Sequence, residues 1–541
     1  MNPNANPKIA LTFSGGGYRA ATFHLGVLSY LHSFKLGNGS LLDCIHAMST
    51  ISGGTITGLR YMLGVSRREQ PENVFKSLYS FFVNVDLASI AMNHLHEKAE
   101  GQTVSLIRTM ANIYNDKLFD GVRMGKLMDE LDKNHIKHFS ANATDFVNAL
   151  PFRFQVTVGK QDTNTGYGII GNYLLPISRT IAKHIRLSEI LACSSCFPSG
   201  FEPIVFPTDF DLGESQEIKE YIEKKEPFGI MDGGIVDNQG IEPIILADDR
   251  MVKNAPEEKD AGFDLVIISD VSSPYMDAYT PSYQNLPPVL NDLNLSKIST
   301  CLWIAGIAIT LLTAVSLSLS PGLFVSGSLF VIWAIVAVLL LCYSILKKKL
   351  FKLVKDSIVK DSISAINKFK VADIATLTVN RVSSVLMLVT TVFMKHIRRM
   401  NYRSAYNKES WQNRCIMNGV YELRPGESWI SKLKKKEFPA YLKPSEVIQQ
   451  TSEKAAAMET TLWFTEKEKK DGVHDALIAT GQYTICFNLL EYIYIIKKNP
   501  VNINEQHKYL ISLEDRLKAD WEKFQKDPMC MMELFARTSP A

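Results

Sequence analysis

Between Ile298 and Leu346 the chain runs for 49 residues without a charged side chain. As a single α-helix, rising about 1.5 Å per residue, this run would be roughly twice as long as the ~30 Å hydrocarbon core of a bilayer is thick. Ser320-Pro321-Gly322 lies near its middle and supplies a helix break. The run therefore predicts a transmembrane helical hairpin over residues 301–346, with helices at Cys301–Leu319 and Leu323–Leu346. A buried hairpin in the core of a soluble protein is the alternative.

The flanks of this run are basic. Lys297 precedes it and Lys347-Lys348-Lys349 follow it, so the positive-inside rule places both ends in the cytoplasm. Residues 347–370 carry eight lysines against two aspartates. This pattern is typical of a basic amphipathic helix on an anionic leaflet, although an ordinary amphipathic core helix shares it. Residues 1–7 are polar and lack the pattern of a signal peptide. We therefore expect an integral membrane protein with a cytoplasmic N-terminus and C-terminus.

Composition argues against several other classes of protein. The net charge of +3 is too small to indicate a nucleic-acid partner. The eight cysteines are scattered, which suits free thiols in a reducing compartment. Cys193-Ser194-Ser195-Cys196 is the only CxxC motif, and no second cysteine or histidine pair lies at zinc spacing. We expect no metal site.

A glycine-rich loop near the N-terminus predicts an anion site. Ile9–Phe13 is a short apolar run suited to a buried strand, Ser14–Arg19 is the loop, and Ala20–Leu31 has a helical pattern. Backbone N–H groups at such a helix start can hold a phosphate or a developing oxyanion. Gly15-x-Gly17-x-x-Ala20 also fits the dinucleotide fingerprint, but no strand ending in an acidic residue follows about 20 positions later.

Two later turns supply a nucleophile and a base. Ser52 lies between a predicted strand, Ile45–Ile51, and a predicted helix, Thr55–Gly64, where a nucleophile elbow places its serine. Asp232 follows the strand-like Phe228–Met231, and its carboxylate is suited to accept the serine proton. No histidine lies in either motif. His24 and His46 are expected to be core residues.

Four motifs in this order resemble those of the patatin-like phospholipases. The family's oxyanion loop with its arginine is similar to Gly15–Arg19, and its nucleophile elbow is similar to Thr50–Gly54. Its Asp-Gly-Gly motif is similar to Asp232–Gly234, and its segment of small residues before proline is similar to Ala192–Pro198. The resemblance covers at least residues 8–272. It implies a three-layer α/β/α fold with a mainly parallel central sheet.

The resemblance also implies a serine–aspartate dyad that releases fatty acid without calcium or any cofactor. Ser52 would be the nucleophile and Asp232 the general base. The backbone N–H groups that would form the oxyanion hole belong to Gly15, Gly16 and Gly17. Arg19 would orient this loop, meet a lipid phosphate, or make only a structural ion pair. Thr50 stands where the family usually has glycine, and Ala20 where a glycine often follows the arginine. Both changes bear on pocket shape and catalytic efficiency, not on reaction class.

The rest of the chain divides around the predicted hairpin. Residues 1–285 form the catalytic region and residues 286–300 a linker. Residues 371–541 are mainly helical, with a possible strand at Gly419–Leu423, and either complete the catalytic domain or form a separate one. Val382–Met394 is apolar but too short for a further membrane span.

These features together predict a membrane-anchored phospholipase of the A type that acts on phospholipids of its own bilayer from the cytoplasmic side. An acyltransferase using the same dyad is one alternative, and a non-catalytic membrane scaffold is another. The sequence leaves homo-oligomerisation and any regulator open.

Overall fold

The computed structural model describes residues 7–536 in part. The residues outside the description are 1–6, 37–38, 95–104, 159–167, 199, 256–260, 274, 277, 284–286, 288–292, 319–327, 329, 339, 342–343, 346–369, 427–438, 499–504 and 537–541. The described chain forms two compact units, one of Met1–Tyr275 with Val392–Ala541 and one of Met276–Thr391.

The first unit is built on a ten-stranded sheet in the order β12-β11-β1-β4-β5-β6-β7-β8, with β10 beside β5 and β9 beside β10. The pairs from β12 through β5 are parallel, and those beyond β5 are antiparallel. The strands are β1 Ile9–Phe13, β4 Ile45–Ile51, β5 His138–Asp145, β6 Leu150–Thr157, β7 Ile170–Gly171, β8 Pro176–Ile177, β9 Ile204–Phe206, β10 Phe228–Asp232, β11 Leu265–Asp270 and β12 Cys415–Gly419. A separate small hairpin pairs β2 Lys35–Leu36 with β3 Gly39–Ser40.

Helices cover both faces of this sheet. Helices from the N-terminal part are α1 Gly17–Ser33, α2 Gly53–Arg67, α3 Pro71–Asn84, α4 Leu87–His94, α5 Leu106–Tyr114, α6 Met124–Glu130, α7 Arg179–Ala182, α8 Leu187–Ser195, α9 Gln216–Lys224, α10 Gly234–Asp237 and α11 Ile241–Asn254. Those from the C-terminal part are α17 Met394–Asn407, α19 Glu446–Ala456, α20 Glu466–Lys470, α21 Val473–Lys498, α22 Glu505–Ser512, α23 Glu514–Lys526 and α24 Glu533–Ala536.

Apolar side chains point to both faces of the central strands, because successive side chains of a strand point to opposite faces. Helices pack on each face, which gives the three layers. Leu265 and Ile267 of β11 pack into the larger core with α1 and α21. Val266 and Ile268 pack into the smaller core with α11 and α17. The mainly parallel α/β sandwich expected from the sequence is confirmed, with a helical C-terminal region.

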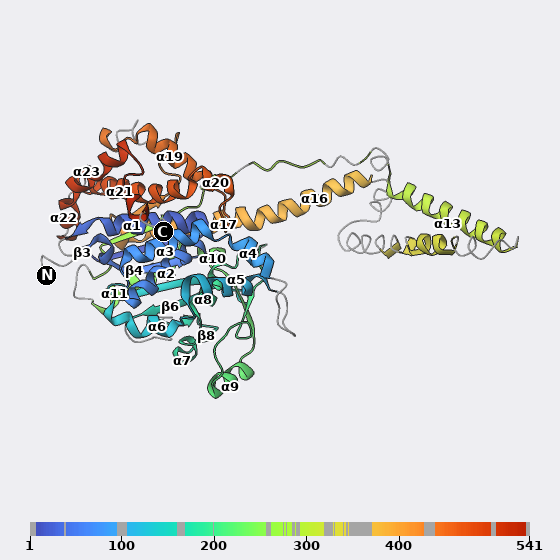
Figure 1. Cartoon of the computed structure of the whole chain (residues 1–541), viewed down its shortest axis with the longest axis horizontal. Coiled ribbons are helices and arrows are strands. Elements are labelled where there is room, and N and C mark those ends of the chain that lie inside the picture. The colour runs from blue at the N-terminus through green and yellow to red at the C-terminus, as the bar shows by residue number, and fades with distance from the viewer. Residues whose placement is uncertain are drawn as a thin grey trace. The chain divides into compact units, whose positions relative to one another are not determined.

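The C-terminal part of the chain is built into the first unit. β12 extends the sheet beside β11 with Val266 opposite Cys415, and α21 packs along α1. Figure 1 shows the C-terminal helices α19, α21 and α23 gathered over α1. The contact between α1 and α21 is close, since a Cβ on Gly26 would lie 2.0 Å from the Ile478 carbonyl oxygen. β12 begins four residues before the strand predicted at Gly419–Leu423, and Val420–Leu423 form a turn instead.

The second unit is rich in exposed apolar helix. α13, Leu295–Ser318, is long and apolar enough to cross a membrane, and its apolar side chains, such as Trp303 and Leu311, are exposed. Residues 328, 330–338, 340–341 and 344–345 of the second predicted span are helical where described. Trp333 Nε1 donates to Thr310 Oγ1 at 3.2 Å, so these two helical stretches lie side by side. The predicted break at 320–322 and the lysine-rich stretch 347–369 lie outside the described residues.

A further apolar helix differs from the sequence-based expectation. α16, Val371–Met387, continues through a π-helical turn at Leu388–Phe393 into α17. The continuous helix Val371–Asn407 is long and apolar enough to cross a membrane, by length and composition. The stretch Val382–Met394, which is too short for a span by itself, is the middle of this longer helix.

Candidate functional site

The register of the sheet brings the predicted nucleophile and base together. β4 pairs with β5 as far as Ile51 opposite Asn142. β10 takes over the same edge of β5 at the next residue, where Asp232 lies opposite Ala143. Because β10 runs antiparallel to β5, it ends where β4 ends. Ser52 and Asp232 therefore approach each other across the end of β4.

Ser52 occupies a strained turn between β4 and α2. Its backbone has φ 49° and ψ −119°, a region that a residue with a side chain rarely adopts and that is typical of functional turns. The Ser52 N–H donates to Ser194 Oγ at 2.9 Å, and Ser194 Oγ donates to the Asn142 carbonyl at 2.7 Å. The elbow needs glycine after the serine, since a Cβ on Gly53 would lie 2.1 Å from the Gly17 carbonyl oxygen. The nucleophile turn and the glycine loop thus pack directly against each other.

Thr50 stands in place of the glycine expected two positions before Ser52, and the fold has room for its side chain. Its hydroxyl donates to the Ser140 carbonyl at 3.3 Å and accepts from Thr55 Oγ1 at 3.1 Å. Its methyl group faces Gly58, where a Cβ would lie only 2.4 Å away. A glycine on α2 thus provides the room that the elbow lacks.

Asp232 is a buried carboxylate, and one of its two oxygens has no hydrogen-bond partner within the described chain. Its backbone N–H donates to the Cys196 carbonyl at 3.1 Å, and its carbonyl accepts from Thr144 Oγ1 at 2.7 Å. Oδ1 accepts from the Gly234 N–H at 2.6 Å, whereas Oδ2 is buried without a hydrogen-bond partner of ordinary geometry. Burial raises the pKa of Asp232 to about 7, and the bond from Gly234 and the neighbouring Ser52 hydroxyl oppose this rise. A carboxylate with this pKa and a free oxygen is suited to take a proton from Ser52 near neutral pH.

The glycine loop offers two backbone donors. Gly15 does not fit the donor role predicted for it, because its N–H already donates to the Asn238 carbonyl at 3.1 Å. Among the described residues, no protein acceptor takes the N–H of Gly16 or Gly17. Both have positive φ, 141° and 57°, and a Cβ on Gly17 would lie 2.2 Å from the Thr461 carbonyl oxygen. Of the three glycines predicted to form an oxyanion hole, Gly16 and Gly17 therefore have backbone N–H groups available.

Arg19 ties this loop to the C-terminal part of the chain. Its guanidinium donates to the Met458 carbonyl at 2.8 Å, to Tyr421 Oη at 2.9 Å and to Thr460 Oγ1 at 3.2 Å. The side chain is nearly buried, and burial lowers its pKa. These contacts favour the loop-orienting role over contact with a lipid phosphate.

Sequence reasoning missed the residues that hold Ser52 and Asp232 in place. Ser194 fixes the backbone of Ser52, and the Cys196 carbonyl fixes that of Asp232. Both belong to the segment Ala192–Pro198, whose small residues were noted without a role. Thr144 and Asn238 come from other elements, and nothing in their local sequence marks them.

The two histidines expected to be core residues, His24 and His46, are structural residues. His24 stacks on Phe13 with ring centroids 4.3 Å apart, and burial lowers its pKa to about 3. His46 lies beside His138, and burial lowers the pKa of His46 to about 4. Neither is suited to act as a base for Ser52.

The loop, the elbow and the aspartate turn lie within one segment that matches a known family. Residues 11–245 match the family model of the patatin-like phospholipases. The fold of this region is therefore a patatin-like α/β fold, and the match supports the predicted class of enzyme, a phospholipase or lipid ester hydrolase. No curated protein matches the chain.

Solved structures of human GIVD cytosolic phospholipase A2 also match. One shares 15% sequence identity, with 49% of this chain and 43% of that chain covered and a TM-score of 0.30. Another, in complex with methyl gamma-linolenyl fluorophosphonate, shares 18% identity, with 49% and 40% covered and a TM-score of 0.28. The chain spans less than half the length of these structures.

Proposed function

We propose that this protein is a membrane-anchored lipid acyl hydrolase of the phospholipase A type, with Ser52 as nucleophile and Asp232 as general base. The observation that carries the proposal is the meeting of the ends of β4 and β10 beside Asn142 and Ala143 of β5, which brings a strained serine to a buried carboxylate of raised pKa. The match to the patatin-like phospholipase model supports the substrate class.

In the proposed reaction Ser52 Oγ attacks the ester carbonyl while its proton passes to Asp232. The oxyanion accepts hydrogen bonds from the N–H groups of Gly16 and Gly17 at the start of α1, where the helix dipole also favours negative charge. The carbon–oxygen bond to the lysolipid then breaks, and the leaving oxygen takes the proton from Asp232. Water attacks the acyl-serine, gives a proton to Asp232, and the fatty acid leaves as Ser52 regains its proton.

The chain leaves the first unit after Tyr275 and returns to it at Val392, which supports a specific membrane topology. Residues 1–275 and 392–541 belong to one compact unit, so the chain between them must cross a bilayer an even number of times. α13 and the helical stretch around residues 330–338 supply two antiparallel crossings. The helix Val371–Asn407 is then not a third complete crossing, despite its length. Both termini and the catalytic unit lie on one side, and the flanking lysines make that side the cytoplasm.

Fatty-acid release from phospholipid liposomes tests the proposal. The wild-type chain is reconstituted beside the variants Ser52→Ala and Asp232→Asn, and fatty acid is measured by mass spectrometry. We expect a loss of at least about 1,000-fold in both variants, because either removes a member of the dyad. Equal release from all three proteins would reject the dyad. An acyl group found on an added alcohol or lysolipid instead of as free acid would identify an acyltransferase.

A further inference from the structure

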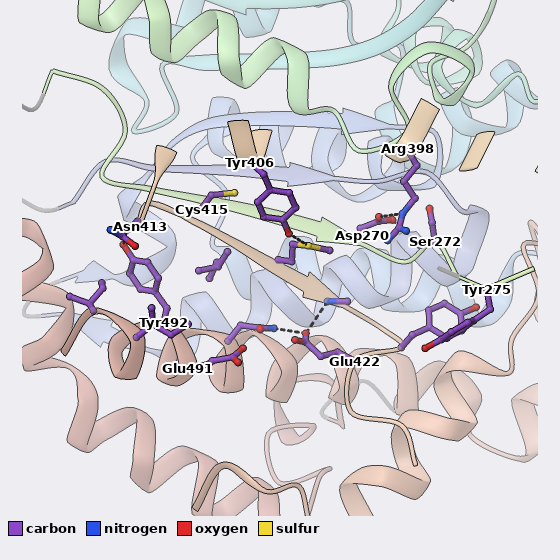
Figure 2. Close-up of a pocket in the computed structure, with 17 residues that line it drawn as sticks. Asp270, Ser272, Tyr275, Arg398, Tyr406, Asn413, Cys415, Glu422, Glu491 and Tyr492 are labelled. Carbon is purple, nitrogen blue, oxygen red and sulfur yellow. Dashed lines mark hydrogen bonds and ion pairs between the residues drawn. The ribbon is translucent and has the colours of Figure 1, made fainter. Parts of the chain in front are cut away.

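The candidate site lies at one end of the central sheet. β1, β4, β11 and β12 are parallel, so their carboxyl ends share this end. Ser52 follows β4 here, and Figure 2 shows Asp270, the last residue of β11, with Ser272 close to it. Ser272 Oγ accepts from Asn238 Nδ2 at 2.8 Å, and the Asn238 carbonyl accepts from the Gly15 N–H. Ligands of α/β sheets bind beyond such carboxyl ends, so a lipid substrate approaches the sheet from this side.

The sheet continues past Ser52 as a wall of strands. β4 ends at Ile51 opposite Asn142, whereas β5 continues to Asp145. Three further residues at about 3.3 Å each carry β5 roughly 10 Å beyond the end of β4. β6 and β10 flank this extension of β5 on its two sides. The turn between β5 and β6, residues 146–149, therefore lies beyond the nucleophile on the side from which a substrate approaches.

Two turns at the end of this wall expose apolar side chains. Phe146 and Val147, in the turn between β5 and β6, are 59% and 66% exposed. Tyr173 and Leu174, in the turn between β7 and β8, are 68% and 50% exposed. Because β7 runs antiparallel to β6, it ends where β6 begins, and the two turns lie at the same end of the sheet. Single exposed apolar residues are ordinary, but a cluster of them beside a site marks an interaction surface.

A buried polar contact holds the two turns together. The Asp145 carboxylate accepts from the Val147 N–H at 2.9 Å and from Asn172 Nδ2 at 3.0 Å. Asn172 Oδ1 accepts in turn from the N–H groups of Leu174 and Leu175 at 2.9 and 2.8 Å. Asp145 and Asn172 are both buried. The backbone of each turn is thus fixed before anything binds to it, which lowers the entropy cost of binding through the exposed side chains.

The composition of the turns indicates what they bind. Neither turn contains a charged residue: their sequences are Phe146-Val147-Asn148-Ala149 and Asn172-Tyr173-Leu174-Leu175-Pro176. The carboxylate that joins them, Asp145, is buried beneath them. Entry of these turns into a lipid interface therefore takes no charge out of water. Tyrosine is also enriched at the headgroup level of bilayers, where its ring is apolar and its hydroxyl stays hydrated. These features favour a bilayer surface over a charged partner.

We propose that Phe146, Val147, Tyr173 and Leu174 dock on the phospholipid bilayer and present the candidate site to lipid. This inference rests on the proposed function, because it takes the substrate to be lipid of that bilayer. Apolar faces of interfacial helices enter the headgroup boundary by about 5–10 Å. The same depth at these turns, which lie roughly 10 Å beyond the end of β4, holds Ser52 at the level of the headgroups. The nucleophile then reaches an ester of a lipid that stays largely in the bilayer.

Photolabelling tests the docking directly and needs no hydrolysis. The full chain with Ser52→Ala is placed in phosphatidylcholine nanodiscs that contain a phosphatidylcholine with a diazirine near its ester, and adducts are located by peptide mass spectrometry. We expect adducts on residues 146–147 and 173–174, besides those in the predicted hairpin. Val252 is the matched control, since it is exposed and lies beside Gly262, before the start of β11 at the opposite end of the sheet. No adduct on either turn, or equal labelling of Val252, overturns the proposal.

Two variants test the consequence for catalysis. Phe146→Asp and Tyr173→Asp each bring a charge into the interface and should lower fatty-acid release from liposomes about tenfold or more. Hydrolysis of a short-chain soluble ester needs no bilayer and should fall by less than about twofold in both. Val252→Asp should affect neither reaction. Equal losses on liposomes and on the soluble ester, or unchanged release from liposomes, would contradict the docking. Adducts on both turns of a chain whose wild type releases no fatty acid would reject the proposed function and keep the docking surface.

Discussion

The replacement Asp232→Asn should make the protein more stable above pH 7 while it abolishes activity. The native protein holds the Asp232 proton until the pH reaches about 7, whereas an ordinary aspartate releases it near 3.8. The native state therefore binds more protons than the unfolded state between these values, and stability falls as the pH rises through this window. The side chain is 2% exposed, so solvent screens little of this effect. The rise of the Asp232 pKa from 3.8 to about 7 corresponds to a loss of about 4 kcal/mol in the free energy of unfolding, as an upper limit.

Asparagine has nearly the same shape and carries no charge to bury. We expect the variant to unfold at a higher temperature than the wild type at pH 5, and this difference to grow by several degrees between pH 5 and pH 8. Tryptophan fluorescence in micelles at pH 5, 6, 7 and 8 measures the unfolding temperature. Asp116→Asn, at an exposed position, is the control and should show no pH-dependent difference. If the difference in unfolding temperature between Asp232→Asn and the wild type stays constant from pH 5 to pH 8, the argument from burial is refuted.

Three further predictions concern the site. Ser194→Ala leaves the Ser52 N–H without its acceptor and should lower kcat about 10- to 100-fold with little change in KM. Ser195→Ala removes a hydroxyl that bonds to its own helix and should retain activity. Hydrolysis of a short-chain soluble ester should rise about tenfold from pH 6 to a plateau above pH 8, since Asp232 must be ionised; a profile that is flat over this range would argue against this base. Gly53→Ala should abolish activity and lower the unfolding temperature, because its Cβ would collide with the Gly17 carbonyl oxygen; a fully active variant would show that the elbow and the loop are not in contact.

Local sequence patterns predicted the elements that carry the site. The runs Ile9–Phe13 and Ile45–Ile51 are strands with the expected bounds, because short apolar runs bounded by turn residues are a strong strand signal. β12 was placed four residues late. Its residues Cys415–Gly419 contain one β-branched side chain, and its strand character comes from pairing with β11.

Contacts between distant residues were beyond the reach of sequence patterns. That β10 ends beside Ser52 depends on its antiparallel register with β5, which nothing in the local sequence of β10 encodes. Arg19 meets Tyr421, 402 residues away, so its three partners were not foreseeable from the loop. The pairing of the Gly15 N–H with Asn238 likewise joins segments far apart in the chain, and it reduced the predicted oxyanion donors from three to two.

Labelling with a fluorophosphonate probe tests the central claim most directly, because the probe reacts only with an activated serine. The full chain in membranes is treated with the probe, and the modified residue is identified by peptide mass spectrometry. We expect a single adduct on Ser52, labelling that is lost in Ser52→Ala and strongly slowed in Asp232→Asn, and fatty-acid release from liposomes that falls in parallel. An unlabelled Ser52 in a folded chain, or labelling at full rate in Asp232→Asn, would contradict the proposed dyad.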